Sequence, residues 1–285
     1  MTSSFRIRIL IILGLFFQTL YACTTPTPVP SSSSSERVTL LHTEVRQFDS
    51  PATGRNYNIY IRLPDDYVQD EAKKYPILYV LDGQWDFKML DSIYGGLLYD
   101  GFIPEMIIVG ITYSGDNADY GALRAMDYTP VHDVFFRGSG DVPKFLTFLK
   151  EQLIPFMETN YRTDQSRRLL MGSSFGGTFT LYTMFTDPTL FSGYVASSPI
   201  VTYGGRFAFQ QEAEYAEGHT DLPVRLFVGV GGLEDIAYPV EEFTQILDGR
   251  DYPGLEMEFR VIEGEGHASN KPEAYNRGLR FVLSK

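Results

Sequence analysis

The chain has 285 residues, of which 44% are hydrophobic and 14% aromatic, a composition typical of a packed globular protein and not of a disordered one. Its net charge of −12 argues against a nucleic-acid-binding protein and against binding to a strongly anionic membrane surface. A single cysteine excludes an internal disulfide, and four histidines without H-x-H or H-E-x-x-H spacing argue against a metal site.

Residues 1–22 predict a lipoprotein-type signal peptide. Arg6 and Arg8 precede an apolar run, residues 9–17, that is too short for a membrane span, and a small residue precedes Cys23. The sequence LYAC resembles a bacterial lipobox. We therefore expect lipidation of Cys23 and an exported protein tethered to a membrane, periplasmic or on the cell surface. An ordinary secretory signal with an incidental cysteine is the alternative.

The segment of residues 23–36 reads as a linker after the lipidated cysteine, because its Thr, Pro and Ser residues (TTPTPVPSSSSS) cannot form a core. Residues 37–285 are expected to form one domain, since they show no internal repeat and no second core. The oligomeric state does not follow from the sequence.

Strands are predicted in two groups within this domain. The first two alternate apolar and polar residues around a turn at Pro51–Gly54, which predicts an antiparallel pair at a sheet edge. The later ones are continuous apolar runs, typical of strands that helices cover on both faces. The predicted strands are Val38–Val45, Tyr57–Leu63, Tyr75–Leu81, Met106–Ile111, Arg167–Met171, Tyr194–Ala196, Val224–Val230 and Leu255–Ile262.

Helices are predicted between these strands. One begins at Asp141 as N-cap and is bent or ended by Pro155; others span Gly177–Phe185 and, approximately, Pro272–Leu283. Strands that alternate with helices after a hairpin predict an α/β fold, with a mostly parallel sheet, helices on both faces and an antiparallel N-terminal edge.

The stretch LLMGSSFGG, residues 169–177, contains G-x-S-x-G with Ser174 at its centre. A strand before it and a helix after it are the context of a nucleophile elbow, a tight turn that lifts the serine hydroxyl clear of the sheet. We expect Gly176 and Gly177 to let the following helix pack closely. A plain turn of small residues would give the same letters.

A serine nucleophile needs a general base and an acid that orients it, and an α/β-hydrolase supplies them after later strands in the order Ser, acid, His. His267 lies in a glycine-rich loop after the last strand and is the candidate base. Glu234 and Asp235 both follow the preceding strand, and the order of residues does not choose between them.

Two backbone N–H groups are needed to stabilise the oxyanion. The amide of Phe175, directly after the nucleophile, is one candidate. The loop after the strand Tyr75–Leu81 should supply the other, and Gln84 is our choice, although Asp-Gly at this place also fits a simple turn.

From about Tyr57 to the C-terminus the chain resembles an esterase family within the α/β-hydrolases. The family includes esterase D, feruloyl and acetylxylan esterases, the mycolyltransferase antigens and the enterochelin (siderophore trilactone) esterases, and the last branch is the most similar. The matching segments are YNIYIRLPDDY, KKYPILYVLDGQWDF, RAMDYTP, FLTFLKEQLIPFMETNYRTD, RRLLMGSSFGG, ASSPI and EGEGHASNKPEAYNRGLRFVL.

The resemblance implies an α/β-hydrolase fold and assigns roles by position. It makes Ser174 the nucleophile, His267 the base, the amides of Phe175 and Gln84 the oxyanion donors, and it favours Glu234 over Asp235 as the acid.

The resemblance and the aromatic stretches also suggest residues that bind substrate. Tyr203 stands where relatives often have tryptophan. Arg124 lies in the R-x-x-D-x-T-P segment and could face the cleft or pair with Asp127. Trp85 begins one of three aromatic stretches, 85–99, 113–128 and 203–215, that are expected to wall the cleft.

The expected function is a serine carboxylic-ester hydrolase that forms an acyl-enzyme and acts on siderophore lactones or other small esters. An acyltransferase of the same fold and a non-catalytic surface binding lipoprotein are the alternatives. We expect no cofactor, since the nearest approach to a dinucleotide-binding motif, residues 229–234, lacks its last glycine.

Overall fold

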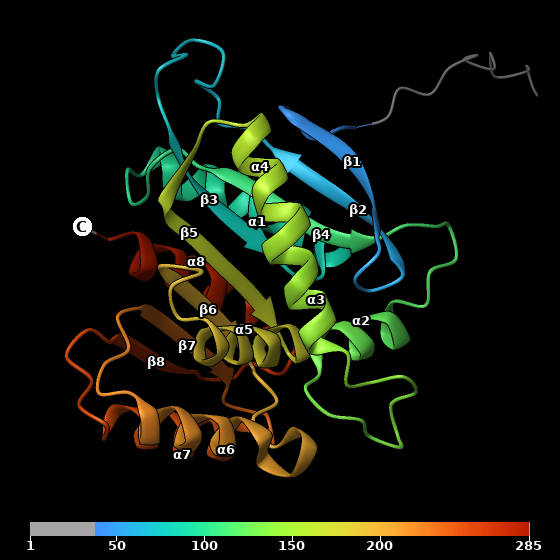
Figure 1. Ribbon diagram of the computed structural model, residues 1–285. Helices are drawn as coiled ribbons and strands as arrows, with labels where there is room; N and C mark the ends of the chain where they lie inside the picture. Colours follow the sequence, from blue (N-terminus) through green and yellow to red (C-terminus); the bar gives the residue numbers. More distant parts are fainter. Residues whose placement is uncertain (1–37, 285) are drawn as a thin grey trace, which may run out of the picture. The chain divides into compact units, whose positions relative to one another are not determined.

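Eight strands form one sheet in the order β1-β2-β4-β3-β5-β6-β7-β8 (Figure 1). The structure is a computed structural model that describes residues 38–284, so the predicted signal peptide, Cys23 and the linker lie outside the described residues. The strands are β1 (Thr43–Ser50), β2 (Arg55–Arg62), β3 (Tyr75–Val80), β4 (Ile107–Tyr113), β5 (Thr163–Ser173), β6 (Gly193–Ser197), β7 (Arg225–Gly231) and β8 (Glu256–Ile262).

The pairing has the predicted polarity. β1 pairs with β2 and β2 with β4 in antiparallel fashion, and β4, β3, β5, β6, β7 and β8 are parallel to one another. All six parallel strands therefore end at one edge of the sheet, and the loops that follow them meet there. We call this the carboxyl edge.

Helices cover both faces of the sheet. They are α1 (Gly83–Tyr99), α2 (Tyr120–Tyr128), α3 (Val142–Phe148), α4 (Ile154–Asn160), α5 (Phe175–Thr186), α6 (Tyr203–Gly218), α7 (Ala237–Asp248) and α8 (Lys271–Leu283). Alternate residues of β3 point to opposite faces: Leu78 and Val80 pack with α1 and α8, whereas Ile77 and Tyr79 belong to the core under the other helices. Such burial on both sides explains the continuous apolar runs. This arrangement is the α/β-hydrolase fold.

The first strand is displaced from its prediction. Val38–Val45 was the expected strand, but β1 runs from Thr43 to Ser50. The turn at 51–54 is as predicted, with the N–H of Gly54 bonded to the Ser50 carbonyl at 2.8 Å. That turn sets the register of the hairpin, and so it draws the polar residues just before it into the ladder.

The helix predicted after Asp141 is helical from Val142 to Asn160, so of the two expectations for Pro155 the ending of the helix is wrong. Asp141 makes no capping bond with its side chain, because its carboxylate binds Arg55 and Lys144 instead. Pro155 does not end the helix. A π-helical turn, η1 (Leu149–Leu153), leads directly into α4, and Pro155 lies inside this continuous helical run just after the π-helical turn.

The aromatic stretches expected to wall the cleft contribute mainly to the core. Tyr94, Tyr113, Tyr128 and Tyr215 are buried, and α1, α2 and α6 overlap these stretches. Trp85 and Tyr99 are exceptions, with 50% and 92% of their surfaces exposed. Among the described residues, the helices include none that is both long and apolar enough to span a membrane.

Candidate active site

The nucleophile elbow lies where β5 ends at Ser173 and α5 begins at Phe175. Ser174, between them, has φ 60° and ψ −123°, a conformation that residues other than glycine rarely adopt. Its N–H donates to the Ser197 carbonyl at 2.9 Å, and its own carbonyl accepts the N–H of Thr178 at 2.9 Å. These bonds hold the sharp turn from strand to helix that G-x-S-x-G predicts.

Close packing at the elbow requires Gly172. A Cβ at position 172 would lie 2.5 Å from the Gly176 carbonyl group. A Cβ on Gly177 would lie 3.0 Å from the Ser197 carbonyl oxygen, which is also tight, whereas one on Gly176 would meet nothing closer than 3.4 Å. The expectation that both later glycines allow close packing therefore holds for Gly177 and is wrong for Gly176.

Glu234 and His267 meet at the carboxyl edge, each in the loop after its own strand. Oε2 of Glu234 lies 2.5 Å from Nδ1 of His267. The glutamate side chain is only 4% exposed, whereas the imidazole is 46% exposed. A carboxylate at Nδ1 favours the tautomer with its proton there, which leaves Nε2 free to accept a proton.

The second carboxylate oxygen of Glu234 is held by three donors. Oε1 accepts from the Gly231 N–H at 2.7 Å, from the Ser198 hydroxyl at 2.6 Å and from the Asn270 amide at 3.1 Å. These bonds fix the carboxylate in one orientation. Asp235, the alternative acid, is exposed, and its carboxylate has no hydrogen-bond partner within residues 38–284.

Asn270 also joins the histidine loop to the elbow. Its side-chain oxygen accepts from Ser197 Oγ at 2.7 Å, and its amide donates to the His267 carbonyl at 3.0 Å. Ser197 is the residue whose carbonyl accepts the N–H of Ser174. Ser198 and Asn270 were not predicted as site residues. Both lie in segments that carry the family resemblance, but the order of catalytic residues along a chain says nothing about such supporting groups.

The two predicted oxyanion amides lie at helix N-termini. Phe175 is the first residue of α5, and Gln84 is the second residue of α1 rather than part of a loop. In the described part of the chain neither N–H is hydrogen-bonded to another group, as expected for the first turn of a helix. Asp82, directly before α1, has φ 55° and so directs the chain sharply into the helix.

Arg124 pairs with Asp82 and not with Asp127. Its Nε and Nη2 donate to the two Asp82 oxygens at 2.9 and 2.8 Å, and Nη2 also lies 3.3 Å from the Ser173 carbonyl. Burial lowers the pKa of Arg124, but the facing Asp82 carboxylate together with Tyr128 and Tyr113 raises it, so the pKa lies above its ordinary value. The guanidinium therefore ties the start of α1 to the residue before the nucleophile.

An aromatic cluster packs against the elbow. The Phe175 ring contacts the rings of Phe136 and Tyr203, with centroids 5.1 and 5.3 Å apart. Tyr203 is buried and donates its hydroxyl to the Val131 carbonyl at 3.0 Å. Tyr203 thus shapes the surface beside the nucleophile through packing. The half-exposed Trp85 has its ring centroid 5.8 Å from the guanidinium carbon of Arg124.

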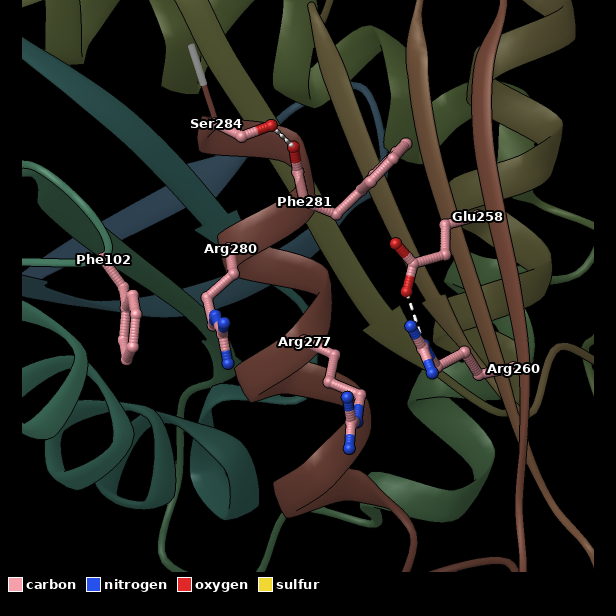
Figure 2. Close-up of a pocket in the computed structure, with 7 residues that line it drawn as sticks. All are labelled: Phe102, Glu258, Arg260, Arg277, Arg280, Phe281 and Ser284. Carbon is pink, nitrogen blue, oxygen red and sulfur yellow. Dashed lines mark hydrogen bonds and ion pairs between the residues drawn. The ribbon is translucent and has the colours of Figure 1, made fainter.

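A shallow hollow of about 340 Å³ opens over the acid and base. Its lining residues are Ile200, Leu233, Glu234, Asp235, Ile236 and His267. Another hollow, of about 360 Å³, lies around α8 and contains no predicted site residue; Figure 2 shows its arginines and Phe102. Within residues 38–284, no group of three or more His, Cys, Asp or Glu side chains could hold a metal ion.

A family model described as "Putative esterase" matches residues 50–232, which is more than half of the chain. The chain belongs to this esterase family.

Individual relatives agree with the family. The esterase is 27% identical to the "Ferri-bacillibactin esterase BesA" of Bacillus subtilis (strain 168), a match that covers 89% of this chain and 93% of that protein. It is 28% identical to the "Apo-salmochelin esterase" of Escherichia coli O6:H1 over 65% of this chain and 59% of that one. A solved structure, the BES protein from Bacillus cereus, matches with a TM-score of 0.80 and 27% identity, over 90% of this chain and 100% of that chain.

Fold, family and relatives together show a carboxylic ester hydrolase. The esterase brings Glu234 and His267 into contact, joins their loops to the elbow that carries Ser174, and places Gln84, Phe175 and Arg124 around that elbow. The predicted lipidation site, Cys23, lies outside the described residues.

Proposed function

We propose that the esterase hydrolyses its substrate with Ser174 as nucleophile, His267 as general base and Glu234 as the acid that orients the imidazole. The bond of 2.5 Å between Glu234 Oε2 and His267 Nδ1 is the observation that carries this proposal. Nε2 takes the hydroxyl proton of Ser174 while Oγ bonds to the ester carbonyl carbon. The same proton then goes to the departing alkoxide, and an acyl-enzyme on Ser174 remains. A water molecule activated by Nε2 hydrolyses this acyl-enzyme and releases the carboxylic acid product.

The oxyanion formed in each step would be stabilised by the N–H groups of Phe175 and Gln84. Both have no protein acceptor in the described part of the chain and lie at the positive ends of helices. Arg124, paired with Asp82, holds the turn before Gln84 beside the same elbow. Preorganised donors of this kind are each worth about 10²-fold or more in kcat.

We propose small esters as substrates, with siderophore lactones as the leading candidates. The names of the relatives, a ferri-bacillibactin esterase and an apo-salmochelin esterase, support this class. A net charge of −12 opposes the approach of an anionic ferric complex, and the positive charge of Arg124 beside the elbow is balanced by Asp82. A screen over siderophore lactones, feruloyl esters, acetylated sugars and simple acyl esters would identify the preferred class.

The mechanism is tested by Ser174→Ala, with Ser173→Ala as the matched control from the same GSSFGG segment. Ser173 is buried, and its hydroxyl has no hydrogen-bond partner in the described residues. We expect Ser174→Ala to abolish hydrolysis of a short-chain aryl ester and covalent labelling by a fluorophosphonate, and Ser173→Ala to keep both. Undiminished turnover by Ser174→Ala would refute the mechanism. Addition of alcohol acceptors to the wild-type assay would reveal acyl transfer as ester products.

We also propose that the protein is exported and anchored through lipid on Cys23, with residues 37–285 as the catalytic domain. The basic, apolar and small-residue pattern before Cys23 supports this proposal. A Cys23→Ser variant should lose incorporation of a labelled fatty acid. Equal incorporation by the variant would exclude this anchor.

A further inference from the structure

Helix α2 carries Arg124, the cation beside the elbow, but has only nine residues. Such a short helix is not stable by itself in water, so its position depends on tertiary contacts. Arg124 makes those contacts on the side of the active site, through Asp82 and the Ser173 carbonyl. Asp127, three residues later on the same helix, makes its contacts with β2.

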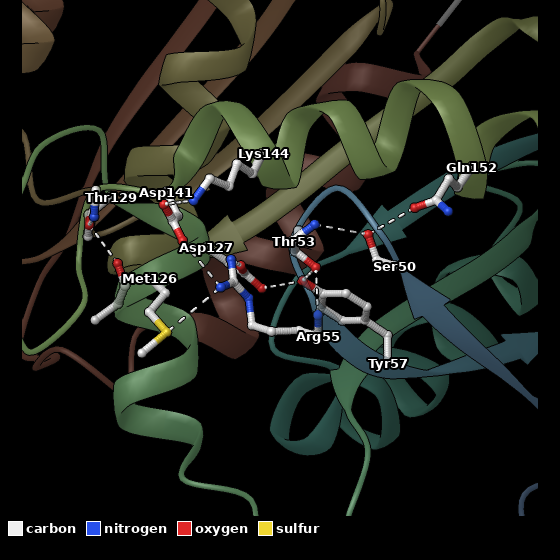
Figure 3. Close-up of polar contacts among 12 residues, drawn as sticks. Ser50, Thr53, Arg55, Tyr57, Met126, Asp127, Thr129, Asp141, Lys144 and Gln152 are labelled. Atoms are coloured by element: carbon white, nitrogen blue, oxygen red, sulfur yellow. Dashed lines mark hydrogen bonds and ion pairs between the residues drawn. The ribbon is translucent and has the colours of Figure 1, made fainter.

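Asp127 is fully buried and is held by β2. Its carboxylate accepts hydrogen bonds from Arg55 Nη2 and, at 2.8 Å, from the Tyr57 hydroxyl (Figure 3). Arg55 also binds the residue before α3, since its Nη1 donates to Asp141 Oδ2 at 3.3 Å. The Tyr57 ring is stacked on Phe148 with centroids 4.4 Å apart. We call Arg55, Tyr57 and Asp127 the α2 anchor.

The anchor is costly to break. Loss of the Asp127 charge removes the ion pair that joins α2 to β2 and leaves the largely buried Arg55 with Asp141 as its remaining carboxylate partner among the described residues. The Asp127 side chain is 0% exposed and that of Arg55 is 12% exposed, so the ion pair is largely shielded from water. Among the elements around Arg55, α2 is a single short helix, whereas α3 continues through η1 into α4.

We propose that the α2 anchor positions Arg124, and through it the Asp82 turn before Gln84, for ester hydrolysis. The expected loss of kcat rests on the proposed function, whereas the expected movement of α2 does not. Asp127 is thus a positioning residue, because it reaches the reaction only through Arg124. A displacement of about 1 Å at a catalytic group can lower a rate about 10²-fold.

Trp85 reports the position of α2 independently of catalysis. It is the only tryptophan of the chain. Its ring lies 5.8 Å from the Arg124 guanidinium carbon and in edge contact with the Tyr120 ring, at 5.9 Å, and both of these residues belong to α2. A movement of α2 therefore changes the emission maximum of Trp85 and its quenching by acrylamide.

The test compares Asp127→Asn with Glu212→Gln in the full chain. Glu212 is a matched control, since it is 1% exposed and accepts two hydrogen bonds from Arg250, at 2.7 and 2.8 Å, on α6. We expect Asp127→Asn to lower kcat at least about 30-fold with KM changed less than about 3-fold, and to shift Trp85 emission and quenching. Glu212→Gln should change neither, even where it lowers stability to a similar extent.

A double-mutant cycle separates positioning from general destabilisation. In an Arg124→Ala background, Asp127→Asn should lower kcat further by less than about 2-fold, because no guanidinium remains to be positioned. Full multiplication of the two losses would overturn the proposal, and so would an unchanged Trp85 signal in Asp127→Asn. If Asp127→Asn does not fold, Tyr57→Phe, which removes one hydrogen bond and keeps the ion pair, should show the same changes with a smaller amplitude, and their absence would be equally decisive. If Ser174→Ala proved as active as wild type, the proposed mechanism would fail, and the fluorescence comparison would still decide whether the anchor holds α2.

Discussion

The proposed role of Glu234 as the acid that orients His267 is best tested by the isosteric substitution Glu234→Gln. Glu234→Gln keeps an oxygen that can accept from Gly231, Ser198 and Asn270, as Oε1 does in the structure. The new amide group must then face His267 Nδ1, where Oε2 now lies at 2.5 Å. An N–H donor at that place requires Nδ1 to be the acceptor, so the imidazole proton moves to Nε2.

A histidine in that tautomer cannot take the serine proton. Reversal of the tautomer in serine hydrolases lowers kcat about 10⁴-fold, which corresponds to about 5 kcal/mol of lost transition-state stabilisation. We expect a loss of about 10³- to 10⁴-fold in Glu234→Gln. The free energy of unfolding should fall by less than about 2 kcal/mol, because the three bonds to Oε1 survive.

Steady-state hydrolysis of an aryl ester and unfolding in urea measure the two quantities. Asp235→Asn is the control, since Asp235 is exposed, and its kcat should stay within about 2-fold of wild type. A loss of less than 10-fold in Glu234→Gln, or a larger loss in Asp235→Asn, would refute the assignment of the acid.

Three further predictions concern the pH dependence of stability, the packing of the elbow glycines and the aromatic cluster beside the elbow. Burial raises the pKa of Asp127 from 3.8 to about 6, although Arg55 opposes this rise, so the native state binds more protons than the unfolded chain between pH 4 and 6. We compare the free energy of unfolding of wild type with that of Asp127→Asn, measured by urea titration at each pH. The wild-type value relative to the variant should fall as pH rises through this window, by up to about 1.4 kcal/mol per pH unit, and should level off above it. An increase of this difference with pH would contradict the structure. Gly172→Ala should unfold at a clearly lower urea concentration than Gly176→Ala, because the Cβ at 172 would lie 2.5 Å from backbone atoms and that at 176 no closer than 3.4 Å; equal midpoints would show that the elbow can relax. Tyr203→Phe, which loses the bond to Val131 and keeps the ring on Phe175, should alter KM for bulky acyl groups by about 2- to 5-fold and leave kcat for acetyl esters unchanged, and a kcat loss shared by all esters would place the hydroxyl in the chemistry instead.

The sheet could be predicted from the sequence because burial on both faces leaves a continuous apolar run. Tyr75–Val80 and Ile107–Tyr113 are such runs, and both are strands. The error at β1 has a local cause, since the segment Glu44 to Gln47 holds one apolar residue, Val45, which is exposed, and the tight turn decides which residues pair. The elbow, the acid loop and the histidine loop were visible for a related reason, because each directly follows a strand.

The partner of Arg124 could not be predicted. Local spacing favours Asp127, three residues later on the same helix, as an ion-pair partner. The structure instead pairs Arg124 with Asp82, 42 positions away, and Asp127 with Arg55, 72 positions away. Such choices depend on how α2 is docked between the hairpin and the elbow, and no periodicity in one sequence encodes that docking. The same holds for Ser198 and Asn270, whose role depends on their hydrogen bonds to Glu234 in the folded chain.

Ser174 sets activity against stability at a single backbone position. Its φ of 60° and ψ of −123° are comfortable for glycine and strained for serine, at a cost of about 1–3 kcal/mol. Substitution by glycine would relieve that strain and remove the nucleophile together. Under selection for thermal stability alone, the mutation that destroys the enzyme is thus among the favoured ones. Any effort to evolve a more robust variant must therefore require turnover in every round, because a folded and long-lived protein is no sign that its nucleophile has been kept.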